Sequence, residues 1–346
     1  MHQSKRLQTL IELGDYLRSP AAQPELQNVA ERAHRQNNWF TPQHNLQALS
    51  NLATQFLAAG PLTAWAAQYP AEPAEPRLIG LVMAGNIPAV GFHDLLCVLV
   101  SGHRALVKLS SQDFVLIQYL IQKISDLNPE LGQSVSVVER LNAADAFIAT
   151  GSDNTARYFH HYFSSRPHII RKNRTSLALL TGTETPDDFN RLGDDILTYY
   201  GLGCRNVSTL LVPENYRFDA LLHTLEPRLS DMLNQHKYQN NYDYNKSIYL
   251  VNRVPHFDNG FLLLTENDAL VSPISVVYYQ TYRTPAEAGE LLRSRADKIQ
   301  VVTTADGQLP ASAEAPVPVV AFGETQRPGL SDYADGVDTM AFLTSL

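Results

Sequence analysis

The sequence predicts a mostly parallel α/β fold preceded by a helical segment, within a chain of 346 residues. From residue 78 onward, short apolar runs alternate with longer amphipathic stretches, which is the pattern of strands joined by crossover helices. The first 70 residues contain no such runs, and their apolar residues recur at helical spacing. An apolar fraction of 44% is ample for a packed core, and the length allows about one to three domains.

Two amphipathic helices are expected in the N-terminal segment. The apolar residues of the first share one face: Leu7, Leu10, Ile11 and Leu17. The second repeats the pattern with Leu46, Leu49, Leu52, Phe56 and Leu57. Gly14 falls on the first face and weakens that prediction, because glycine is a poor helix former. The stretch YPAEPAEP, residues 69–76, carries prolines at a spacing that no helix interior tolerates, so it is expected to be a linker.

Strands and helices are expected to alternate after this linker. The predicted strands lie at residues 78–83, 105–109, 135–139, 146–150, 177–180, 208–212 and 275–282. The predicted helices lie at residues 91–101, 114–127, 154–163, 187–199, 218–235 and 285–294. Residues 245–252 fit either a strand or a helix, and the final stretch GVDTMAFLTSL is expected to be a terminal strand. The later elements indicate a second α/β unit.

Charge, apolar patterning and cysteine content exclude several classes of protein. A formal net charge of −8 argues against nucleic acid as the main partner, because phosphate binding relies on clustered Lys and Arg. No apolar run reaches the roughly 18 residues that span a membrane, and the N-terminus lacks the apolar stretch of a signal peptide. The two cysteines lie too far apart in the chain to indicate a disulfide framework. We therefore expect a cytoplasmic protein with two free thiols.

Two strand-to-helix turns carry residues suited to ligand binding. Gly85-Asn86-Ile87-Pro88 follows the first predicted strand, and the next strand ends in Lys108, with Ser110 and Ser111 close behind. In an open parallel sheet, ligands bind at the carboxyl ends of strands, where both segments are expected. Gly151-Ser152 forms a second turn, whose backbone N–H groups at a helix N-terminus suit a phosphate. Taken singly, each turn is explained equally well by a glycine that needs positive φ.

The two cysteines have different sequence settings. Cys97 lies inside the apolar run LLCVL and is expected to be a small buried hydrophobe. Cys204 lies between a predicted helix and a predicted strand, beside glycines, so the interpretation as a buried hydrophobe does not fit it. Arg205, or the basic cluster at residues 171–174, could lower the pKa of its thiol by charge proximity. The cluster fits equally well as a solvated loop.

Two histidine-containing pairs are left out of the predicted site. His160 and His161 occupy adjacent helical positions that point about 100° apart, and no acidic or cysteine ligand stands at metal spacing. No metal site is therefore predicted. His93 and Asp94 follow the Asn86 turn closely, but the simpler interpretation is a pair at a helix N-terminus, where Asp94 favours the helix dipole.

The order and spacing of these motifs resemble the aldehyde dehydrogenase superfamily over about residues 78–300. In that family, a Trp-Asn-Phe-Pro-like turn supplies an oxyanion-hole asparagine, a later lysine meets the adenosine ribose, a Thr-Gly-Ser turn lies beneath the dinucleotide, and the catalytic cysteine follows. The matching positions here are Asn86, Lys108, Gly151 with Ser152, and Cys204. The motif forms and the short length look most like the LuxC-type acyl-CoA reductases, which make fatty aldehyde for bacterial luciferase.

The resemblance implies an aldehyde dehydrogenase-like division of the chain. A Rossmann-type dinucleotide-binding domain would cover residues 76–172 and be completed by about residues 320–346. An α/β catalytic domain at residues 173–319 would carry the cysteine, and residues 1–75 would form a helical cover and proline-rich linker. The resemblance also implies a homodimer, because the family pairs its subunits through a sheet extension.

Two departures from the family pattern bear on the reaction. Hydrolytic aldehyde dehydrogenases carry a water-activating Glu upstream of the cysteine, whereas the corresponding stretch here, RKNRTSLALL, has no carboxylate. Acyl transfer to a thiol needs no such base, because the thiolate of coenzyme A is already a good nucleophile. The family Glu that holds the nicotinamide ribose aligns with Ala269, so cofactor placement is expected to differ in detail.

The resemblance implies an NAD(P)H-dependent reduction of an acyl thioester, on coenzyme A or an acyl carrier, to an aldehyde. Cys204 would be the acyl-accepting nucleophile and Asn86 the oxyanion donor. Lys108, Ser110 and Ser111 favour NADPH, with NADH possible, because Ser111 replaces a Glu that in many relatives repels a 2′-phosphate. Two alternatives stay open: a thiol acyltransferase without dinucleotide, and a non-catalytic scaffold. The presence of both Cys204 and Asn86 argues against the scaffold.

Overall fold

The computed structural model describes residues 1–151 and 153–346, apart from the side chains of residues 153–156 and 160. It divides into two compact units. The first comprises Met1–Asn173 together with Arg327–Leu346, and the second comprises Arg174–Gln326. The chain therefore runs through most of the first unit, then through the whole second unit, and its C-terminal segment returns to the first.

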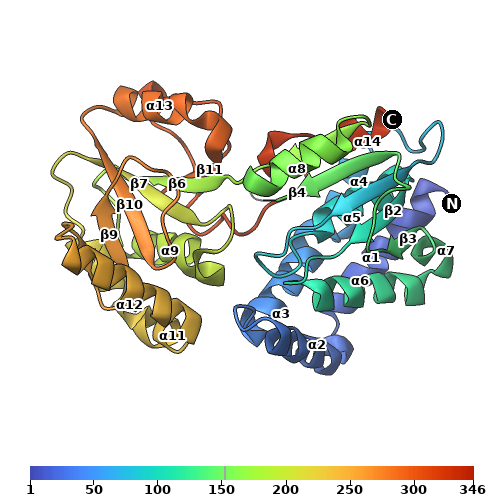
Figure 1. The fold of residues 1–346 in the computed structure, drawn as a ribbon, viewed down its shortest axis with the longest axis horizontal. Coiled ribbons are helices and arrows are strands. Elements are labelled where there is room, and N and C mark those ends of the chain that lie inside the picture. The colour runs from blue at the N-terminus through green and yellow to red at the C-terminus, as the bar shows by residue number, and fades with distance from the viewer. Residues whose placement is uncertain (152) are drawn as a thin grey trace. The chain divides into compact units, whose positions relative to one another are not determined.

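The first unit is built on a five-stranded parallel sheet with the strand order β3-β2-β1-β4-β5 (Figure 1). Its strands are β1 (Leu78–Val82), β2 (Arg104–Lys108), β3 (Val135–Val137), β4 (Ala146–Thr150) and β5 (His168–Arg171). The first four confirm the predicted strands to within two residues at each end. The strand β5 was not predicted, because its four residues include only two apolar ones.

Helices cover both faces of this sheet, as in a doubly wound α/β fold. The helices α5 (Phe92–Ser101) and α6 (Phe114–Leu127) share one core with Ile79 and Leu81 of β1. On the other face, Phe163 of α8 (Asp153–Phe163) stacks on Phe147 of β4 at a ring-centroid distance of 4.0 Å. The alternation of β1 side chains between the two faces explains why this strand is apolar throughout.

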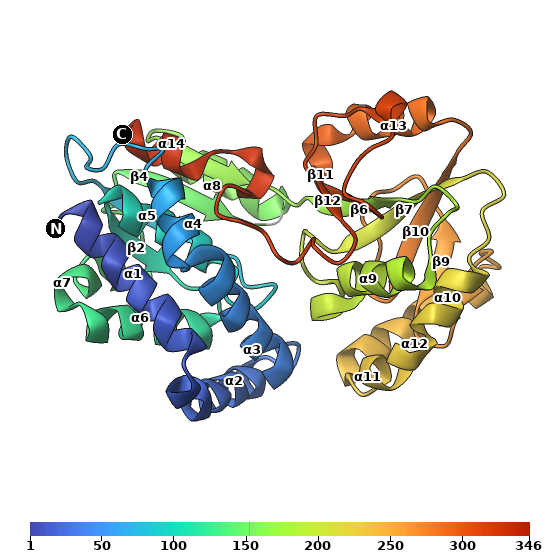
Figure 2. The same ribbon diagram turned by 180° about the vertical axis from the view of Figure 1, so that it is seen from behind.

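The N-terminal helices form a second layer over α5 and α6 (Figure 2). They are α1 (Gln3–Arg18), α2 (Gln23–Gln36), α3 (Pro42–Asn51), a π-helical turn (Leu52–Phe56) and α4 (Ala59–Ala66). The helical prediction for this segment is confirmed, and residues 69–76 form a linker without helix. Gly14 allows close packing, because a Cβ there would lie 2.6 Å from Cβ of Leu57. Its low helix propensity is therefore offset by tertiary contact.

The C-terminal prediction is wrong: the segment forms the helix α14 (Thr339–Thr344), which packs on α5 in the first unit. Asp338 caps this helix by accepting the Ala341 N–H at 2.8 Å, and the buried residues Met340 and Leu343 stand three apart, a helical spacing. The tail therefore supplies no strand for subunit pairing. The homodimer stays a prediction that rests on the family resemblance.

The second unit is built on a seven-stranded sheet with the order β12-β11-β6-β7-β10-β9-β8, in which only β8 runs antiparallel. Its strands are β6 (Thr175–Leu179), β7 (Val207–Pro213), β8 (Phe257–Asp258), β9 (Leu263–Glu266), β10 (Val276–Tyr282), β11 (Ile299–Thr304) and β12 (Val319–Ala321). Of these, β6, β7 and β10 were predicted. The missed strand β11 is buried along its whole length, although half of its residues are polar.

Helices cover both faces of the second sheet, with α13 (Pro285–Ser294) on one side and α9 (Pro186–Leu197), α11 (Leu229–Leu233) and α12 (His236–Val251) on the other (Figure 1). A capping box between Thr185 and Asp188 begins α9. The predicted single helix at residues 218–235 is wrong, because a 3-10 turn containing Pro227 separates α10 (Asp219–Leu225) from α11. The ambiguous residues 245–251 belong to the helix α12.

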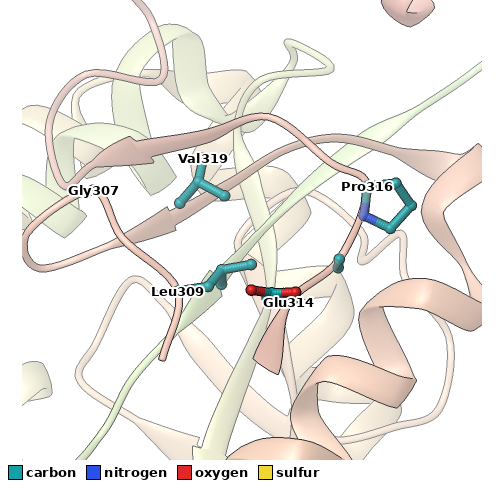
Figure 3. Close-up of a pocket in the computed structure, with 6 residues that line it drawn as sticks. Gly307, Leu309, Glu314, Pro316 and Val319 are labelled. Carbon is teal, nitrogen blue, oxygen red and sulfur yellow. The ribbon is translucent and has the colours of Figure 1, made fainter. Parts of the chain in front are cut away.

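A shallow cavity of about 560 Å³ lies on the connection between β11 and β12. The residues that line it are mostly apolar: Gly307, Leu309, Glu314, Ala315, Pro316 and Val319 (Figure 3). None of the residues predicted from the sequence to act in catalysis or cofactor binding lines it. The cavity therefore does not mark the predicted site.

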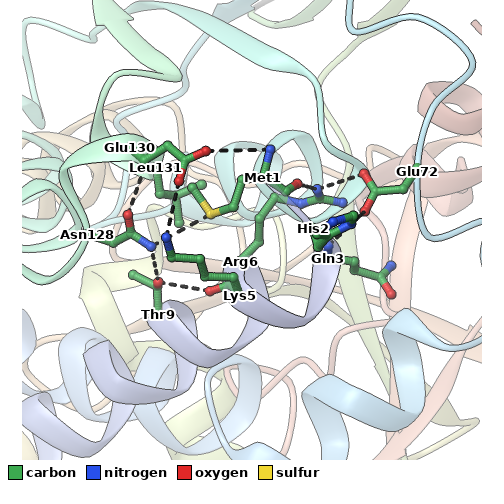
Figure 4. Close-up of polar contacts among 10 residues, drawn as sticks. All are labelled: Met1, His2, Gln3, Lys5, Arg6, Thr9, Glu72, Asn128, Glu130 and Leu131. Atoms are coloured by element: carbon green, nitrogen blue, oxygen red, sulfur yellow. Dashed lines mark hydrogen bonds and ion pairs between the residues drawn. The ribbon is translucent and has the colours of Figure 1, made fainter.

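Arg6 joins the first helix to the linker, where it meets Glu72 (Figure 4), and to the end of α5. Its guanidinium pairs with Glu72 at 3.0 Å and donates to the carbonyls of Ala71 at 2.8 Å and Val100 at 3.1 Å. The side chain is only 4% exposed. A cation at the C-terminal end of α5 also favours the helix dipole. The neighbouring Lys5 forms only an exposed pair with Glu130.

We expect Arg6→Met to lower the free energy of unfolding of the first unit by about 2 to 4 kcal/mol, because it leaves the carbonyls of Met1, Ala71 and Val100 without their donor. Lys5→Met is the matched control and should cost less than about 1 kcal/mol, since its ion pair is exposed. Urea unfolding followed by circular dichroism measures both. Equal effects of the two substitutions would contradict a structural role for Arg6.

Candidate active site

The Asn86 turn and the segment after β2 lie against each other at the carboxyl edge of the first sheet. Val82 pairs with Lys108 on one side and with Ala149 on the other, so the ends of β1, β2 and β4 share this edge. A Cβ at Gly85 would lie 2.3 Å from Oγ of Ser110. Gly85 does not adopt a positive φ. The interpretation of this glycine as a positive-φ residue is therefore wrong, and its role is close approach.

Asn86 is exposed on this turn, and Lys108 is exposed at the last position of β2. Ser111 is also exposed, while Ser110 is partly buried and its Oγ accepts the N–H of Gln112 at 3.2 Å. The edge thus presents one cation, one amide and two hydroxyl groups. These are groups that bind ribose hydroxyls and phosphates.

In the second turn, the structure describes Gly151. The N–H of Gly151 donates to the carbonyl of Arg171 at 3.4 Å, which continues the pairing of β4 with β5. This N–H is already used within the sheet. Ser152 lies outside the described residues.

Cys204 follows a constrained turn in the second unit. After α9, the three successive residues Tyr199, Tyr200 and Gly201 have φ angles of 54°, 57° and 77°. Only glycine adopts this left-handed region readily, and each tyrosine there costs about 1 to 3 kcal/mol. Both tyrosine side chains are buried, and the Tyr200 ring lies 5.9 Å from that of Tyr238. Packing of these rings therefore stabilises the turn.

Asn206 joins the end of α9 to the cysteine turn. Its buried side-chain amide donates to the carbonyls of Asp195 at 3.0 Å, Ile196 at 3.3 Å and Thr198 at 2.8 Å. Its Oδ1 accepts the N–H of Gly203 at 2.8 Å. One side chain thus satisfies orphan carbonyls at a helix end and holds the residue before Cys204. Asn206 was not predicted from the sequence, although an Asn two residues after Cys204 was a visible signal.

Cys204 forms no disulfide, and the residue is partly exposed. Its backbone carbonyl accepts a hydrogen bond from Oγ of Ser176, on the neighbouring strand β6, at 2.9 Å. Cys97 differs in every respect: it is fully buried in α5, and burial raises the pKa of its thiol well above the ordinary value. The prediction that Cys97 is core packing is confirmed.

A buried carboxylate fixes the other side of α9. Asp195 accepts hydrogen bonds from the N–H of Gly323 at 2.8 Å and from both the N–H and the hydroxyl of Thr325, at 3.1 and 2.7 Å. Burial raises the pKa of Asp195 to about 6. Helix α9 is thereby tied to the loop after β12 as well as to the cysteine turn.

Arg171, the first residue of the basic cluster at residues 171–174, is buried and does not belong to a solvated loop. Arg171 is 3% exposed, pairs with Asp94 at 2.5 Å and donates to the hydroxyl of Thr339 at 2.8 Å. Arg174 donates to the carbonyl of Ile299 at 3.1 Å. Asp94 therefore serves an ion pair that joins α5, β5 and the C-terminal segment, in addition to its place in the first turn of α5.

Two segments depart from the family pattern: the one that contains β6 and the one around Ala269. All five residues of β6 are buried and none is acidic. Near the position that lacks the second family glutamate, the carbonyl of Leu270, next to Ala269, accepts hydrogen bonds from the hydroxyls of Ser208 at 2.5 Å and Thr209 at 2.8 Å.

Neither a metal-binding cluster nor a membrane-spanning helix occurs among the described residues. No group of three or more His, Cys, Asp or Glu side chains there is placed to hold a metal ion. None of the helices in that part of the chain is both long and apolar enough to span a bilayer. His161 lies exposed on α8, and the side chain of His160 lies outside the described set.

Solved structures share this fold at very low sequence identity. An Escherichia coli NADP dependent enzyme superposes with a TM-score of 0.65 and 11% identity, covering 88% of this chain and 73% of its own. A variant of propionaldehyde dehydrogenase from the Clostridium phytofermentans fucose utilisation bacterial microcompartment gives 0.63 and 8%, covering 92% and 82%. A variant of betaine aldehyde dehydrogenase from Staphylococcus aureus, in complex with NAD+, gives 0.62 and 10%, covering 88% and 72%.

The sequence itself matches one protein family. No curated protein matches it significantly. The family model described as acyl-CoA reductase (LuxC) matches residues 66–243, which is just over half of the chain and includes both the Asn86 turn and Cys204. The aldehyde dehydrogenase fold of the solved structures agrees with the fold class predicted from the sequence. The chain belongs to the acyl-CoA reductase (LuxC) family and has the fold of the aldehyde dehydrogenases.

Proposed function

We propose that this protein reduces an acyl thioester of coenzyme A or of an acyl carrier to a free aldehyde, with NAD(P)H as reductant and Cys204 as the acyl-accepting nucleophile. The observation that carries the proposal is the Cys204 turn. A partly exposed thiol that forms no disulfide follows the left-handed backbone of residues 199–201. Asn206 holds the N–H of the preceding Gly203, and Ser176 donates to the Cys204 carbonyl. Strained backbone held by its surroundings is typical of functional positions.

The first half of the reaction is acyl transfer. Sγ of Cys204, as thiolate, attacks the thioester carbonyl and forms a tetrahedral oxyanion. The side-chain amide of Asn86 and the N–H of Cys204 are the proposed donors to that oxyanion. The carbon–sulfur bond to the carrier then breaks, the carrier leaves as its thiol, and the acyl group remains on Cys204.

The second half needs a dinucleotide, and the first unit has groups that fit one. At the carboxyl edge of its doubly wound sheet, Lys108, Ser110 and Ser111 would hold the ribose and phosphate. When bound, the reduced nicotinamide supplies the hydride for the acyl carbon. The hemithioacetal then formed on Cys204 breaks its carbon–sulfur bond, which releases the aldehyde and regenerates the thiol.

The buried strand β6 supports thiol chemistry over hydrolysis. It holds no carboxylate where hydrolytic relatives carry a water-activating base. An acyl-enzyme without such a base is long-lived enough to meet hydride or a second thiol. A thiol acyltransferase is the alternative that this feature equally permits, and it would exchange thioesters without any nicotinamide.

We expect Cys204→Ala to abolish covalent labelling by a radioactive acyl-CoA, because the substitution removes the nucleophile. Cys97→Ala is the matched control and should label normally, since that thiol is fully buried. Labelling is measured after denaturing gel electrophoresis. Equal labelling of the Cys204→Ala protein would exclude the acyl-enzyme. NADPH consumption with a panel of acyl-CoA thioesters separates the reductase from the acyltransferase.

We expect Asn86→Ala to lower kcat about 100- to 1000-fold with little change in KM, because an oxyanion donor acts mainly in the transition state. Steady-state kinetics of thioester reduction measure both constants. A variant that loses affinity for the thioester but keeps full turnover would show that Asn86 only forms the turn.

We expect NADPH to bind more tightly than NADH, by about 5- to 150-fold, because a charge-assisted contact of Lys108 with a 2′-phosphate contributes on the order of 1 to 3 kcal/mol. Lys108→Ala should remove most of this preference. Competitive titration of the two cofactors measures it. Tighter binding of NADH, or an equal loss of both cofactors in the variant, would contradict the assignment.

A further inference from the structure

The Asn86 turn ends in a left-handed residue that is not glycine. Ala89 has a φ of 57°, and its side chain is 2% exposed. Its carbonyl accepts the N–H of Phe92 at 3.0 Å, which joins the turn to the start of α5. A left-handed alanine costs about 1 to 2 kcal/mol, so the surrounding structure must hold it.

The group that holds Ala89 is the carboxyl of Asp113. Oδ2 of Asp113 accepts the Ala89 N–H at 2.7 Å, and the side chain is 3% exposed. Asp113 stands at the N-cap position of α6, yet its side chain accepts no hydrogen bond from that helix. A residue of a type that normally caps its own helix is thus directed at the neighbouring turn.

The second carboxyl oxygen makes this arrangement unusual. Oδ1 of Asp113 is buried and has no hydrogen-bond partner among the described residues. Burial raises the pKa of Asp113 well above its ordinary value. A buried carboxyl with a single backbone bond is costly to keep. Helix capping does not explain it, and the bond to Ala89 is the one hydrogen bond that its side chain makes among the described residues.

The backbone around Asp113 is fixed from two directions. Its own N–H donates to the carbonyl of Ser110 at 3.3 Å, and Ser110 lies directly against Gly85. From the N-terminal helical layer, the buried amide of Asn37 donates to the carbonyl and to Oε1 of Gln112, both at 3.3 Å. The backbone that carries the Asp113 carboxyl, which accepts the Ala89 N–H, is therefore held by hydrogen bonds on both sides.

From this geometry we infer that Asp113 is a positioning residue, which orients the Asn86 amide by fixing the backbone at Ala89. The inference rests on the proposed function of Asn86. Asp113 itself is not proposed to contact the substrate or the cofactor. Oxyanion donors act only when placed within about 2.7 to 3.1 Å of the developing charge, so a relaxed turn affects the transition state more than substrate binding.

We expect Asp113→Ala to lower kcat about 10- to 100-fold while KM changes less than about threefold. Asp113→Asn keeps an oxygen acceptor for the Ala89 N–H and should retain kcat within about threefold of the wild type. The matched control is Asp145→Ala, because Asp145 likewise accepts one backbone N–H, that of Leu78 at 2.8 Å, at the opposite end of β1. This control should leave kcat unchanged.

The double variant Asn86→Ala with Asp113→Ala tests whether Asp113 acts through Asn86. It should turn over no more slowly than Asn86→Ala alone, since residues that act as a unit are not additive. A multiplicative loss, an effect confined to KM, or an Asn variant as slow as the Ala variant would overturn the inference.

Amide hydrogen exchange of residues 84–92 tests the positioning without relying on catalysis. Exchange should speed up by about tenfold or more in Asp113→Ala, and should match the wild type in Asp113→Asn and Asp145→Ala. If the wild type shows this protection but reduces no thioester, the proposed function fails and the structural link stands. Unchanged exchange in Asp113→Ala overturns the inference even where the reductase activity is present.

Discussion

Burial of both faces of two mostly parallel sheets is the constraint on which the rest of this structure depends. Strands such as β4 and β6 have no solvent-facing side chains to offer, so polar and reactive groups must stand on the turns at strand ends. Asn86 and Lys108 follow this rule at the carboxyl ends of β1 and β2. Cys204 instead precedes its strand, and its position depends on how α9 ends.

Both turns that carry proposed catalytic residues contain left-handed backbone at residues other than glycine, and a buried polar side chain holds each one. Asn206 satisfies the carbonyls at the end of α9 beside Tyr199 and Tyr200, and Asp113 accepts the N–H of Ala89. The hydrogen bonds offset part of the free-energy cost of the strained backbone. An unsatisfied buried polar group would add a further cost of similar size. Such arrangements select one conformation of the turn over its alternatives.

The N-terminal helices are part of the first unit's core. The N-terminal segment also contacts the polar segment that follows β2. Arg6 binds the linker and the end of α5, while Asn37 supports the segment that carries Asp113. The C-terminal segment adds a second tie through Thr339 and the buried pair of Arg171 with Asp94. Removing one partner of a buried pair leaves an uncompensated charge, so these contacts make the unit sensitive to single substitutions.

The sequence by itself determined the features that depend on local periodicity and on motif order. Residues 114–127 and 146–150 form the predicted helix and strand, Cys97 is buried as expected, and the motif order led to the family. Only the tertiary structure decided the rest. The C-terminal helix, the close approach of Gly85 to Ser110, and the roles of Asp113 and Asn206 depend on contacts between distant segments or on left-handed turns, which local patterns do not encode.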